Sequence, residues 1–229
     1  MRFAFDPAQP VSVPVAGSDR RFPVHRVYCV AKNYAAHARE MGEDPERVPP
    51  AFFLKPADAV VAAVGDVAYP PATSNLHHEV ELVAALGAGG TDVDVGTARE
   101  MIFGYAVGID LTRRDLQQEA RAVGGPWDTG KSFEQAAPMS ELYPIERTGY
   151  LESGRIWLEV NGRIRQDGDI SAMIWNTVEV ISKLSRLFEL RPGDLIFTGT
   201  PEGVGAIVPG DHLRGGIDGV AEFSLHIRG

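Results

Sequence analysis

The chain has 229 residues, a formal net charge of −9, 44% hydrophobic residues and 23% charged residues. This balance is that of a globular protein able to bury a sizeable core. The net negative charge argues against nucleic acid as the partner, because phosphate binding relies on clustered Lys and Arg. No apolar run could span a membrane, the start lacks an apolar signal region, and the single cysteine, Cys29, cannot form an internal disulfide. We therefore expect a soluble protein of the reducing cytoplasm in which Cys29 is a buried, inert thiol.

Turn-forming residues and short apolar runs divide the first half of the chain. Residues 1–23 are rich in proline and valine and are expected to form an extended arm ahead of a single domain over residues 24–229. No linker or low-complexity tract indicates a second domain. The domain is predicted to begin with a strand at Arg26–Ala31, a helix from Asn33 to Met41 that ends at Gly42, and a strand at Ala51–Leu54.

The segment from Leu76 to Leu86 is predicted to be one strand, and it places two carboxylates inside an apolar element. Its alternation puts Glu79 and Glu81 on the same face as His77. Burying an unpaired carboxylate costs several kcal/mol. The two glutamates therefore require either a compensating partner or exposure to water.

A strand over residues 103–111 brings a third acid, Asp110, close to its end. A helix is predicted over residues 112–123, with a capping box formed by its first residue and Asp115. Gly124 follows in the position where a left-handed residue commonly ends a helix. The third carboxylate is thus expected just before a strand-to-helix turn.

The second half of the chain mixes short strands with one helix. The dipeptide Asn161-Gly162 predicts a type I′ turn between two strands. Apolar residues recur at helical spacing over residues 173–190, which predicts a helix whose core-facing stripe is Ile174, Val178, Ile181, Leu184 and Phe188. Strands outnumber helices and do not alternate regularly with them, so the predicted fold class is α+β.

The acidic residues are candidates for a metal site. Two glutamates at positions i and i+2 of a strand can share a cation, and carboxylate oxygens suit Mg²⁺, Mn²⁺ or Ca²⁺. Asp110 would complete a set of three carboxylates if the two strands meet. The alternative is a half-exposed strand face on which Glu79 and Glu81 are solvated.

Two other features could take part in catalysis. His37 and Glu40 lie one turn apart on the predicted helix, and a histidine oriented by a carboxylate is a common water-activating base, although a surface pair has the same spacing. Lys131, in the loop PWDTGKSF, could meet a substrate carboxylate or a developing oxyanion. The stretch FTGTPEGVG, with Thr198 and Thr200, could bind an anion or simply form a tight turn.

Seven motifs between Arg26 and Asp211 occur in an order that closely resembles the fumarylacetoacetate hydrolase family, and more specifically its short acylpyruvate and fumarylpyruvate hydrolase branch. The motifs are CVAKNYAAHAREMG, FFLKPADAVV, LHHEVELVAALG, GYAVGIDLTRRDLQ, GKSF, NGRIRQDGDISAMIW and LRPGDLIFTGTPEGVG. The resemblance implies the mixed β-roll of that family's C-terminal domain, a homodimer, and Mg²⁺ or Mn²⁺ as cofactor.

The resemblance also implies roles for individual residues. Metal ligands would be Glu79, Glu81 and Asp110; the water-activating pair would be His37 and Glu40; the active-site lysine would be Lys131; and a substrate-contacting residue would be Gln117. We add Arg113 and Thr200 as substrate-binding candidates, because an arginine at position 113 or 114 could meet a distal carboxylate of the substrate.

The implied activity is metal-dependent hydrolysis of the C–C bond of an acylpyruvate, a small anionic keto acid, with fumarylpyruvate as the best candidate. Oxaloacetate decarboxylation and isomerisation or hydration of a 2-hydroxy-dienoate remain open on the same scaffold. A non-catalytic protein that binds a metal or a ligand is the alternative outside enzymes. The presence of both the His37–Glu40 pair and Lys131 favours an enzyme.

Overall fold

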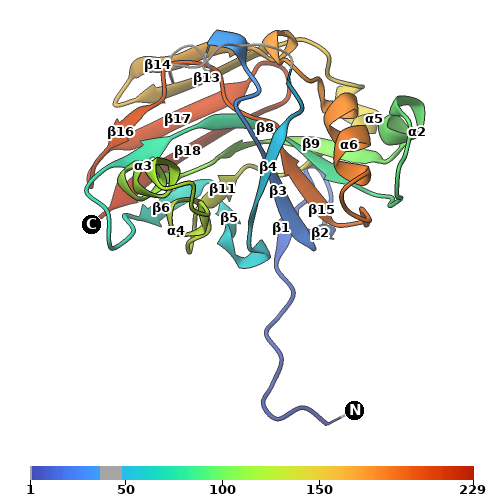
Figure 1. Ribbon diagram of the computed structural model, residues 1–229, viewed down its shortest axis with the longest axis horizontal. Coiled ribbons are helices and arrows are strands. Elements are labelled where there is room, and N and C mark those ends of the chain that lie inside the picture. Colours follow the sequence, from blue (N-terminus) through green and yellow to red (C-terminus); the bar gives the residue numbers. More distant parts are fainter. Residues whose placement is uncertain (1, 37–47) are drawn as a thin grey trace.

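The computed structural model describes residues 2–36 and 48–229 of the chain. A curled sheet of order β4-β3-β15-β8-β9-β11-β5, with β12 beside β9, forms the centre of the molecule (Figure 1). Its strands are β3 (Arg26–Ala31), β4 (Ala51–Lys55), β5 (Val60–Ala62), β8 (Val80–Leu86), β9 (Ile102–Ile109), β11 (Ala137–Met139), β12 (Tyr143–Pro144) and β15 (Asp194–Phe197). Both parallel and antiparallel pairs occur in this sheet, as in β15–β3 and β15–β8.

Another sheet, of order β14-β13-β17-β18-β6, packs against the first through contacts of β13, β17 and β18 with β8 and β9. Its strands are β6 (Val64–Ala68), β13 (Arg155–Val160), β14 (Arg163–Asp169), β17 (His212–Ile217) and β18 (Ala221–Arg228). A smaller sheet joins β7 (Leu76–His78), β10 (Thr112–Arg113) and β16 (Gly205–Ile207). Curled mixed sheets with few helices confirm the predicted α+β class.

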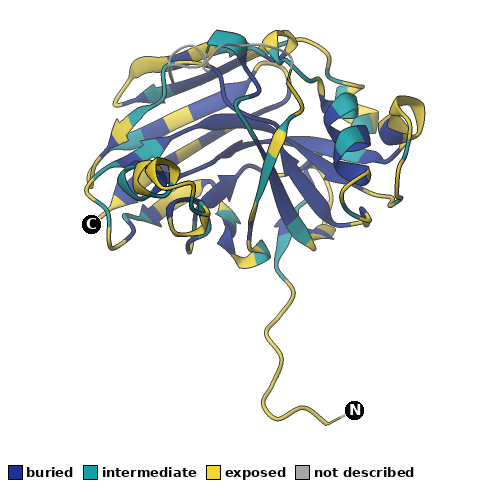
Figure 2. Cartoon of the chain, in the orientation of Figure 1, coloured by how far each residue is buried: buried dark blue, intermediate teal, exposed yellow. Residues whose placement is uncertain are grey.

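The helices are short and lie at the edges of the sheets (Figure 1). They are α2 (Val95–Glu100), α3 (Arg114–Ala122), α4 (Asp128–Lys131), α5 (Ile145–Thr148) and α6 (Thr177–Ser185), with 3-10 turns at Ala57–Ala59 and Ile170–Ala172. Figure 2 shows that buried residues concentrate in the strands, whereas α2 is largely exposed. Within residues 2–36 and 48–229, no helix has the length and apolar content needed to cross a membrane.

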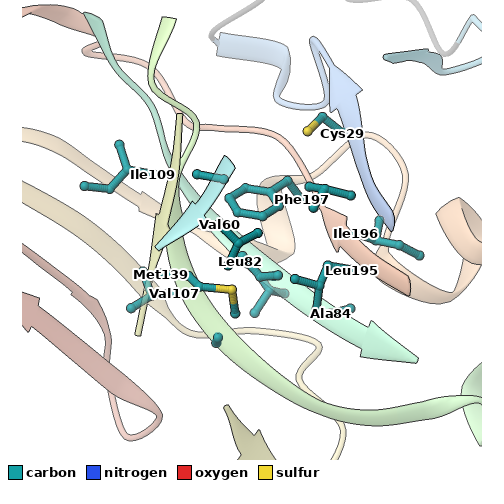
Figure 3. Close-up of a cluster of buried hydrophobic side chains, with 14 of the residues drawn as sticks. Cys29, Val60, Leu82, Ala84, Val107, Ile109, Met139, Leu195, Ile196 and Phe197 are labelled. Carbon is teal, nitrogen blue, oxygen red and sulfur yellow. The ribbon is translucent and has the colours of Figure 1, made fainter. Parts of the chain in front are cut away.

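The apolar core lies on β8, β9 and β15, where every residue of β8 is buried (Figure 3). The ring of Phe197 lies against Gly108 of β9, and a Cβ added at Gly108 would stand 2.6 Å from that ring. Cys29 lies in this core, as predicted, and is fully buried. Burial, followed by the charge of Asp110, raises the pKa of its thiol well above the usual value, which makes the thiol inert at neutral pH.

The N-terminal residues contain a short hairpin. Strands β1 (Ser12–Pro14) and β2 (Arg21–Pro23) pair with each other, and their central residues, Val13 and Phe22, are buried. Residues 2–10 are exposed and without regular structure, and they extend away from the body of the molecule (Figure 1).

Several predicted elements are confirmed, and the predicted helix over 173–190 is shorter than expected. Strand β3 has its predicted bounds, and the β13–β14 hairpin turns at Asn161 and Gly162, whose φ angles of 52° and 73° suit a type I′ turn. Helix α6 begins only at Thr177, and the backbone amides of residues 174 and 175, which precede it, donate to Asn33 O and Asn33 Oδ1. Asn176 and Glu179 form a capping box that fixes this start.

The predicted strand from Leu76 to Leu86 is broken at Glu79. Strand β7 pairs with β10 and β16, whereas β8 pairs with β9 and β15, so the chain passes from one sheet to another at this residue. The Asp110 amide donates to the Glu79 carbonyl at 2.8 Å and holds the crossing in place. Glu79 at the crossing and Glu81 on β8 both lie close to Asp110.

The predicted capping box at Thr112 is wrong. Thr112 and Arg113 form β10, and helix α3 begins at Arg114 without a side-chain cap. The Thr112 hydroxyl accepts from Lys131 Nζ at 2.7 Å, while Asp115 accepts from Thr73 Oγ1 at 2.6 Å. Pairing with residues distant in sequence therefore overrides the local helix-start pattern. Gly124, with φ 66°, ends the helix region as predicted.

A buried glutamine fixes the crossing between the sheets. Gln166 of β14 is fully buried; its amide oxygen accepts from Val80 N at 3.1 Å and lies 2.8 Å from His78 Nδ1, and its amide nitrogen donates to Thr200 Oγ1 at 2.7 Å and Pro201 O at 2.9 Å. One side chain thus satisfies four buried polar atoms around the segment that leads to Glu79 and Glu81.

We expect Gln166→Leu to lower the free energy of unfolding by about 3 kcal/mol, because several buried polar atoms lose their partner at once. Urea denaturation followed by circular dichroism measures the change. Asp167→Asn is the matched control at the next position, since Asp167 pairs with Arg155 on the surface, and it should stay within about 0.5 kcal/mol of the parent. Equal stabilities for the Gln166 variant and the parent would contradict this role.

Candidate active site

Three carboxylates from two separate backbone segments lie close together. Glu79 lies at the crossing between β7 and β8, Glu81 lies on β8, and Asp110 follows β9. One oxygen of each lies within 4.8 Å of the others, and the three residues are only 6%, 2% and 1% exposed. The solvated strand face considered from the sequence is therefore wrong, and the metal interpretation has the geometry that it needs.

Three buried cations surround two of these carboxylates. Lys131, at the end of α4, donates to Asp110 Oδ2 at 2.5 Å and to Glu79 Oε2 at 3.0 Å. Lys55, at the end of β4, lies 2.8 Å from Asp110 Oδ1, and Arg114 pairs with Glu79 Oε1. Burial lowers the pKa of Lys131, but the charges of Asp110 and Glu79 outweigh it and leave the pKa above its usual value. Lys131 is thus an ammonium ion at neutral pH.

Glu81 has a different environment. Within the described ranges, the ion pairs of the cluster go to Glu79 and Asp110, whereas Glu81 accepts a hydrogen bond of 2.8 Å from the amide of Gly199. Gly199 has φ 97°, and a Cβ there would stand 2.7 Å from Asn33 Cβ, so this position requires glycine. Burial, then the charges of Asp110 and Glu79, raises the pKa of Glu81 well above its usual value.

The donor set fits a hard divalent cation. Mg²⁺ and Mn²⁺ bind carboxylate oxygens, and a doubly charged ion would stabilise the ionised form of Glu81 that burial disfavours. The three carboxylates approach from different backbone segments and so can occupy separate positions around one ion. Glu79, Glu81 and Asp110 can therefore hold a metal ion at the floor of a pocket.

Polar and aromatic side chains both line this pocket. The predicted residues Gln117, Lys131 and Thr200 line it together with the three carboxylates, and so does Arg114. Other lining residues are Val30, Ala31, Lys32, Phe53, Gln118, Arg121 and Trp127. The Thr200 hydroxyl donates to the Val80 carbonyl at 2.8 Å, so it also ties the pocket wall to β8.

Arg113 lies outside this pocket lining. It donates to the Thr129 carbonyl at 3.2 Å and stands over the ring of Phe133, 4.4 Å from its centroid. Arg114 instead faces the site: it is 3% exposed, pairs with Glu79 and donates to Gln117 Oε1 at 2.5 Å. The arginine next to the carboxylates is therefore Arg114, the alternative left open by the sequence.

The two histidines of the HHEVEL stretch do not line the pocket. His77 Nε2 lies 3.0 Å from Asn75 Oδ1, and burial, followed by the charge of Arg114, lowers its pKa to about 4. His78 contacts Gln166 and is buried. The predicted pair His37 and Glu40 lies outside the residues that the structure describes.

Sequence reasoning missed Lys55 as a member of the site. It is 2% exposed, and besides Asp110 it donates to the carbonyl oxygens of Leu111, at 3.2 Å, and Lys131. A lysine inside the apolar run AFFLK was the available signal, since lysine is almost never fully buried unless it is paired. Lys55 links a candidate metal ligand to the backbone of the active-site lysine.

Comparisons with known proteins agree with this architecture. The family model for the C-terminal domain of fumarylacetoacetate hydrolase matches residues 26–228. The crystal structure of the fumarylpyruvate hydrolase of Pseudomonas aeruginosa in complex with Mn²⁺ and pyruvate has a TM-score of 0.97 and 54% identity, and the similarity covers 99% of each chain.

Two curated relatives have different names. Fumarylpyruvate hydrolase of a Ralstonia species is 49% identical over 176 residues, which cover 77% of this chain and 91% of the relative. The mitochondrial oxaloacetate tautomerase of Rattus norvegicus is 41% identical over 201 residues, which cover 88% of this chain and 90% of the relative. The protein therefore has the fold that its sequence motifs predicted, and it is an enzyme. The chain belongs to the fumarylacetoacetate hydrolase family.

Proposed function

We propose that the protein is a divalent-metal-dependent hydrolase that cleaves fumarylpyruvate to fumarate and pyruvate. The observation that carries the proposal is the convergence of three buried carboxylates within 4.8 Å, in a pocket that also holds the Lys131 ammonium. The relatives from Pseudomonas aeruginosa and the Ralstonia species, both named fumarylpyruvate hydrolase, support it.

The proposed cofactor is Mg²⁺ or Mn²⁺ held by Glu79, Glu81 and Asp110. Such an ion supplies positive charge that binds the oxygens of a keto acid and stabilises negative charge that develops on them. The remaining contributions come from the chain itself. Lys131, kept protonated by its neighbours, adds a second positive charge beside the same oxygens.

We assign substrate orientation to the Arg114–Gln117 pair and water activation to His37 with Glu40. The amide of Gln117 lines the pocket, and its side chain is fixed by the 2.5 Å hydrogen bond from Arg114. His37 would remove a proton from water, and the resulting hydroxide would attack the acyl carbonyl of the substrate. The C–C bond breaks, its electron pair passes to the pyruvate half, which takes up a proton, and the acyl half leaves as a carboxylate.

The purified protein with Mn²⁺ is expected to hydrolyse fumarylpyruvate, and His37→Ala should slow this reaction by about 10²- to 10⁴-fold because it removes the general base. Loss of substrate absorbance and release of pyruvate measure the rate. Oxaloacetate decarboxylation needs no attack by water, so the same variant should retain whatever activity the parent has on oxaloacetate. A parent enzyme that leaves fumarylpyruvate intact would refute the proposed function.

Oxaloacetate chemistry is the second candidate. The observation in its favour is the 41% identical relative named oxaloacetate tautomerase, whose similarity covers 88% of this chain. Tautomerisation and decarboxylation of oxaloacetate both pass negative charge to an oxygen that the cation and Lys131 could stabilise. A higher kcat/KM for oxaloacetate than for fumarylpyruvate would favour this candidate.

We also propose that the enzyme acts as a homodimer in the cytoplasm. The family resemblance supports the dimer, and the single cysteine, buried in the core, suits a reducing compartment.

A further inference from the structure

Helix α3 presents one polar face to the pocket. Arg114, Gln117, Gln118 and Arg121 all line the pocket, and their spacing of i, i+3, i+4 and i+7 places them on one stripe of the helix. At 1.5 Å per residue, Arg114 and Arg121 are about 10 Å apart along the helix axis. The stripe therefore begins at the carboxylates, where Arg114 pairs with Glu79, and ends with an exposed guanidinium at the mouth.

Two aromatic rings also line the pocket. Phe53 and Trp127 both line the pocket, and their ring centroids are 5.9 Å apart with the planes tilted by 58°. Lys131 Nζ lies 5.0 Å from the centroid of the Phe53 ring, so the aromatic pair is also next to the carboxylate cluster. A pocket lined by aromatic rings and by a row of hydrogen-bond donors suits a flat, unsaturated carbon chain.

We infer that Arg121 determines substrate specificity by binding the distal carboxylate of a dicarboxylic acylpyruvate. The inference rests on the proposed function: a keto acid whose pyruvate end lies at Glu79, Glu81 and Asp110 directs its acyl end along α3. In fumarylpyruvate that end carries a second carboxylate, and an arginine at the mouth matches it in charge and hydrogen-bonding geometry. Gln118, one turn before Arg121 on the same face, adds an amide donor.

Two of the other cations that line the pocket, Arg114 and Lys131, contact the carboxylate cluster itself. Arg114 is held between Glu79 and Gln117, and Lys131 donates to Glu79, Asp110 and Thr112. Lys32, on the loop after β3, also lines the pocket, but its ammonium lacks the planar fork with which arginine binds a carboxylate through two hydrogen bonds. Arg121 lines the pocket and lies at the end of the stripe that is farther from the carboxylates.

The test compares fumarylpyruvate with acetylpyruvate, which has the same pyruvate end and a methyl group in place of the carboxyvinyl group that carries the distal acid. Arg121→Gln is expected to lower kcat/KM for fumarylpyruvate about tenfold, mainly through KM, and to leave kcat/KM for acetylpyruvate unchanged. Arg121→Lys should recover part of the loss. The proposed ion pair between Arg121 and the distal carboxylate is exposed to solvent. Added salt should therefore reduce the preference of the parent enzyme for fumarylpyruvate over acetylpyruvate, and it should leave the preference of Arg121→Gln unchanged.

Arg186→Gln serves as the matched control, since Arg186 lies beyond the end of α6, pairs with Asp92 and is similarly exposed. It should leave both substrates unaffected. The inference would be overturned if Arg121→Gln lost activity equally on both substrates, or if the ratio of the two kcat/KM values stayed unchanged. Hydrolysis of fumarylpyruvate by the parent enzyme, and with it the proposed function, would still stand. The same ratio in Lys32→Met tests the competing cation, and a selective loss in that variant alone would move the assignment from Arg121 to Lys32.

Discussion

Replacing Glu81 by glutamine is expected to abolish the thermal stabilisation that Mn²⁺ gives to the protein and to reduce turnover about a thousandfold or more. The variant keeps the shape of the side chain and removes one carboxylate from a set of three. Loss of the positive charge beside the reacting oxygens costs about 4 kcal/mol or more in the transition state, which corresponds to this factor. Thermal unfolding with EDTA or Mn²⁺, together with steady-state kinetics, measures both effects.

The metal-free form of the same variant should behave in the opposite way. Glu81 is 2% exposed and stands near Asp110 and Glu79, so a neutral amide at this position relieves a buried charge. We expect its midpoint of unfolding in EDTA to equal or exceed that of the parent. A variant that loses stability in EDTA and still gains it from Mn²⁺ would show that Glu81 is structural and not a ligand.

Lys55→Met is expected to lower the free energy of unfolding in EDTA by about 3 kcal/mol or more. The substitution removes a fully buried ammonium that lies 2.8 Å from Asp110, and it leaves the carbonyl oxygens of Leu111 and Lys131 without this donor. With Mn²⁺ present the loss should be smaller, because the cation compensates Asp110. Denaturant titrations in EDTA and in Mn²⁺ give the two values.

A double variant separates charge compensation from packing. Lys55→Met combined with Asp110→Asn removes both members of the buried pair, so it should regain part of the stability lost by Lys55→Met in EDTA. It should not regain turnover, since a candidate metal ligand is missing. If the double variant is less stable than the sum of the two single changes predicts, packing of the lysine stem, and not its charge, explains the effect.

Short sequence patterns predicted the elements that depend only on neighbouring residues, such as the turn at Asn161 and Gly162. Asn161 and Gly162 require positive φ, and the structure gives both of them that conformation. The position of Glu79 depends on long-range pairing: β7 leaves one sheet and β8 joins another, which alternation along residues 76–86 cannot show. The helix start at Thr112 was predicted wrongly for the same reason, because residues 112 and 113 pair with residues 76 and 77.

In the candidate site, too, some residues could be identified from the sequence, whereas others depend on contacts between distant segments. The i, i+2 spacing of Glu79 and Glu81 identified two carboxylates, and the strand-end position of Asp110 and the loop position of Lys131 made these two residues further candidates. Family resemblance gave the four residues their roles, and the structure brings them together. The sequence could not identify Lys55, nor decide between Arg113 and Arg114, because both answers depend on which side chains face the carboxylate cluster. That direction is set by packing between β4, β10 and α4, elements far apart in the sequence.

The burial of Cys29 has a practical consequence for following ligand binding in solution. Because this cysteine is the single one in the sequence and is sealed in the core, the parent protein should resist maleimide reagents and provide a low background. A cysteine introduced at Glu119, on an exposed face of α3, would then accept one fluorophore at a known place. Its emission would report when a keto acid enters beside that helix, without a second mutation to remove a competing thiol.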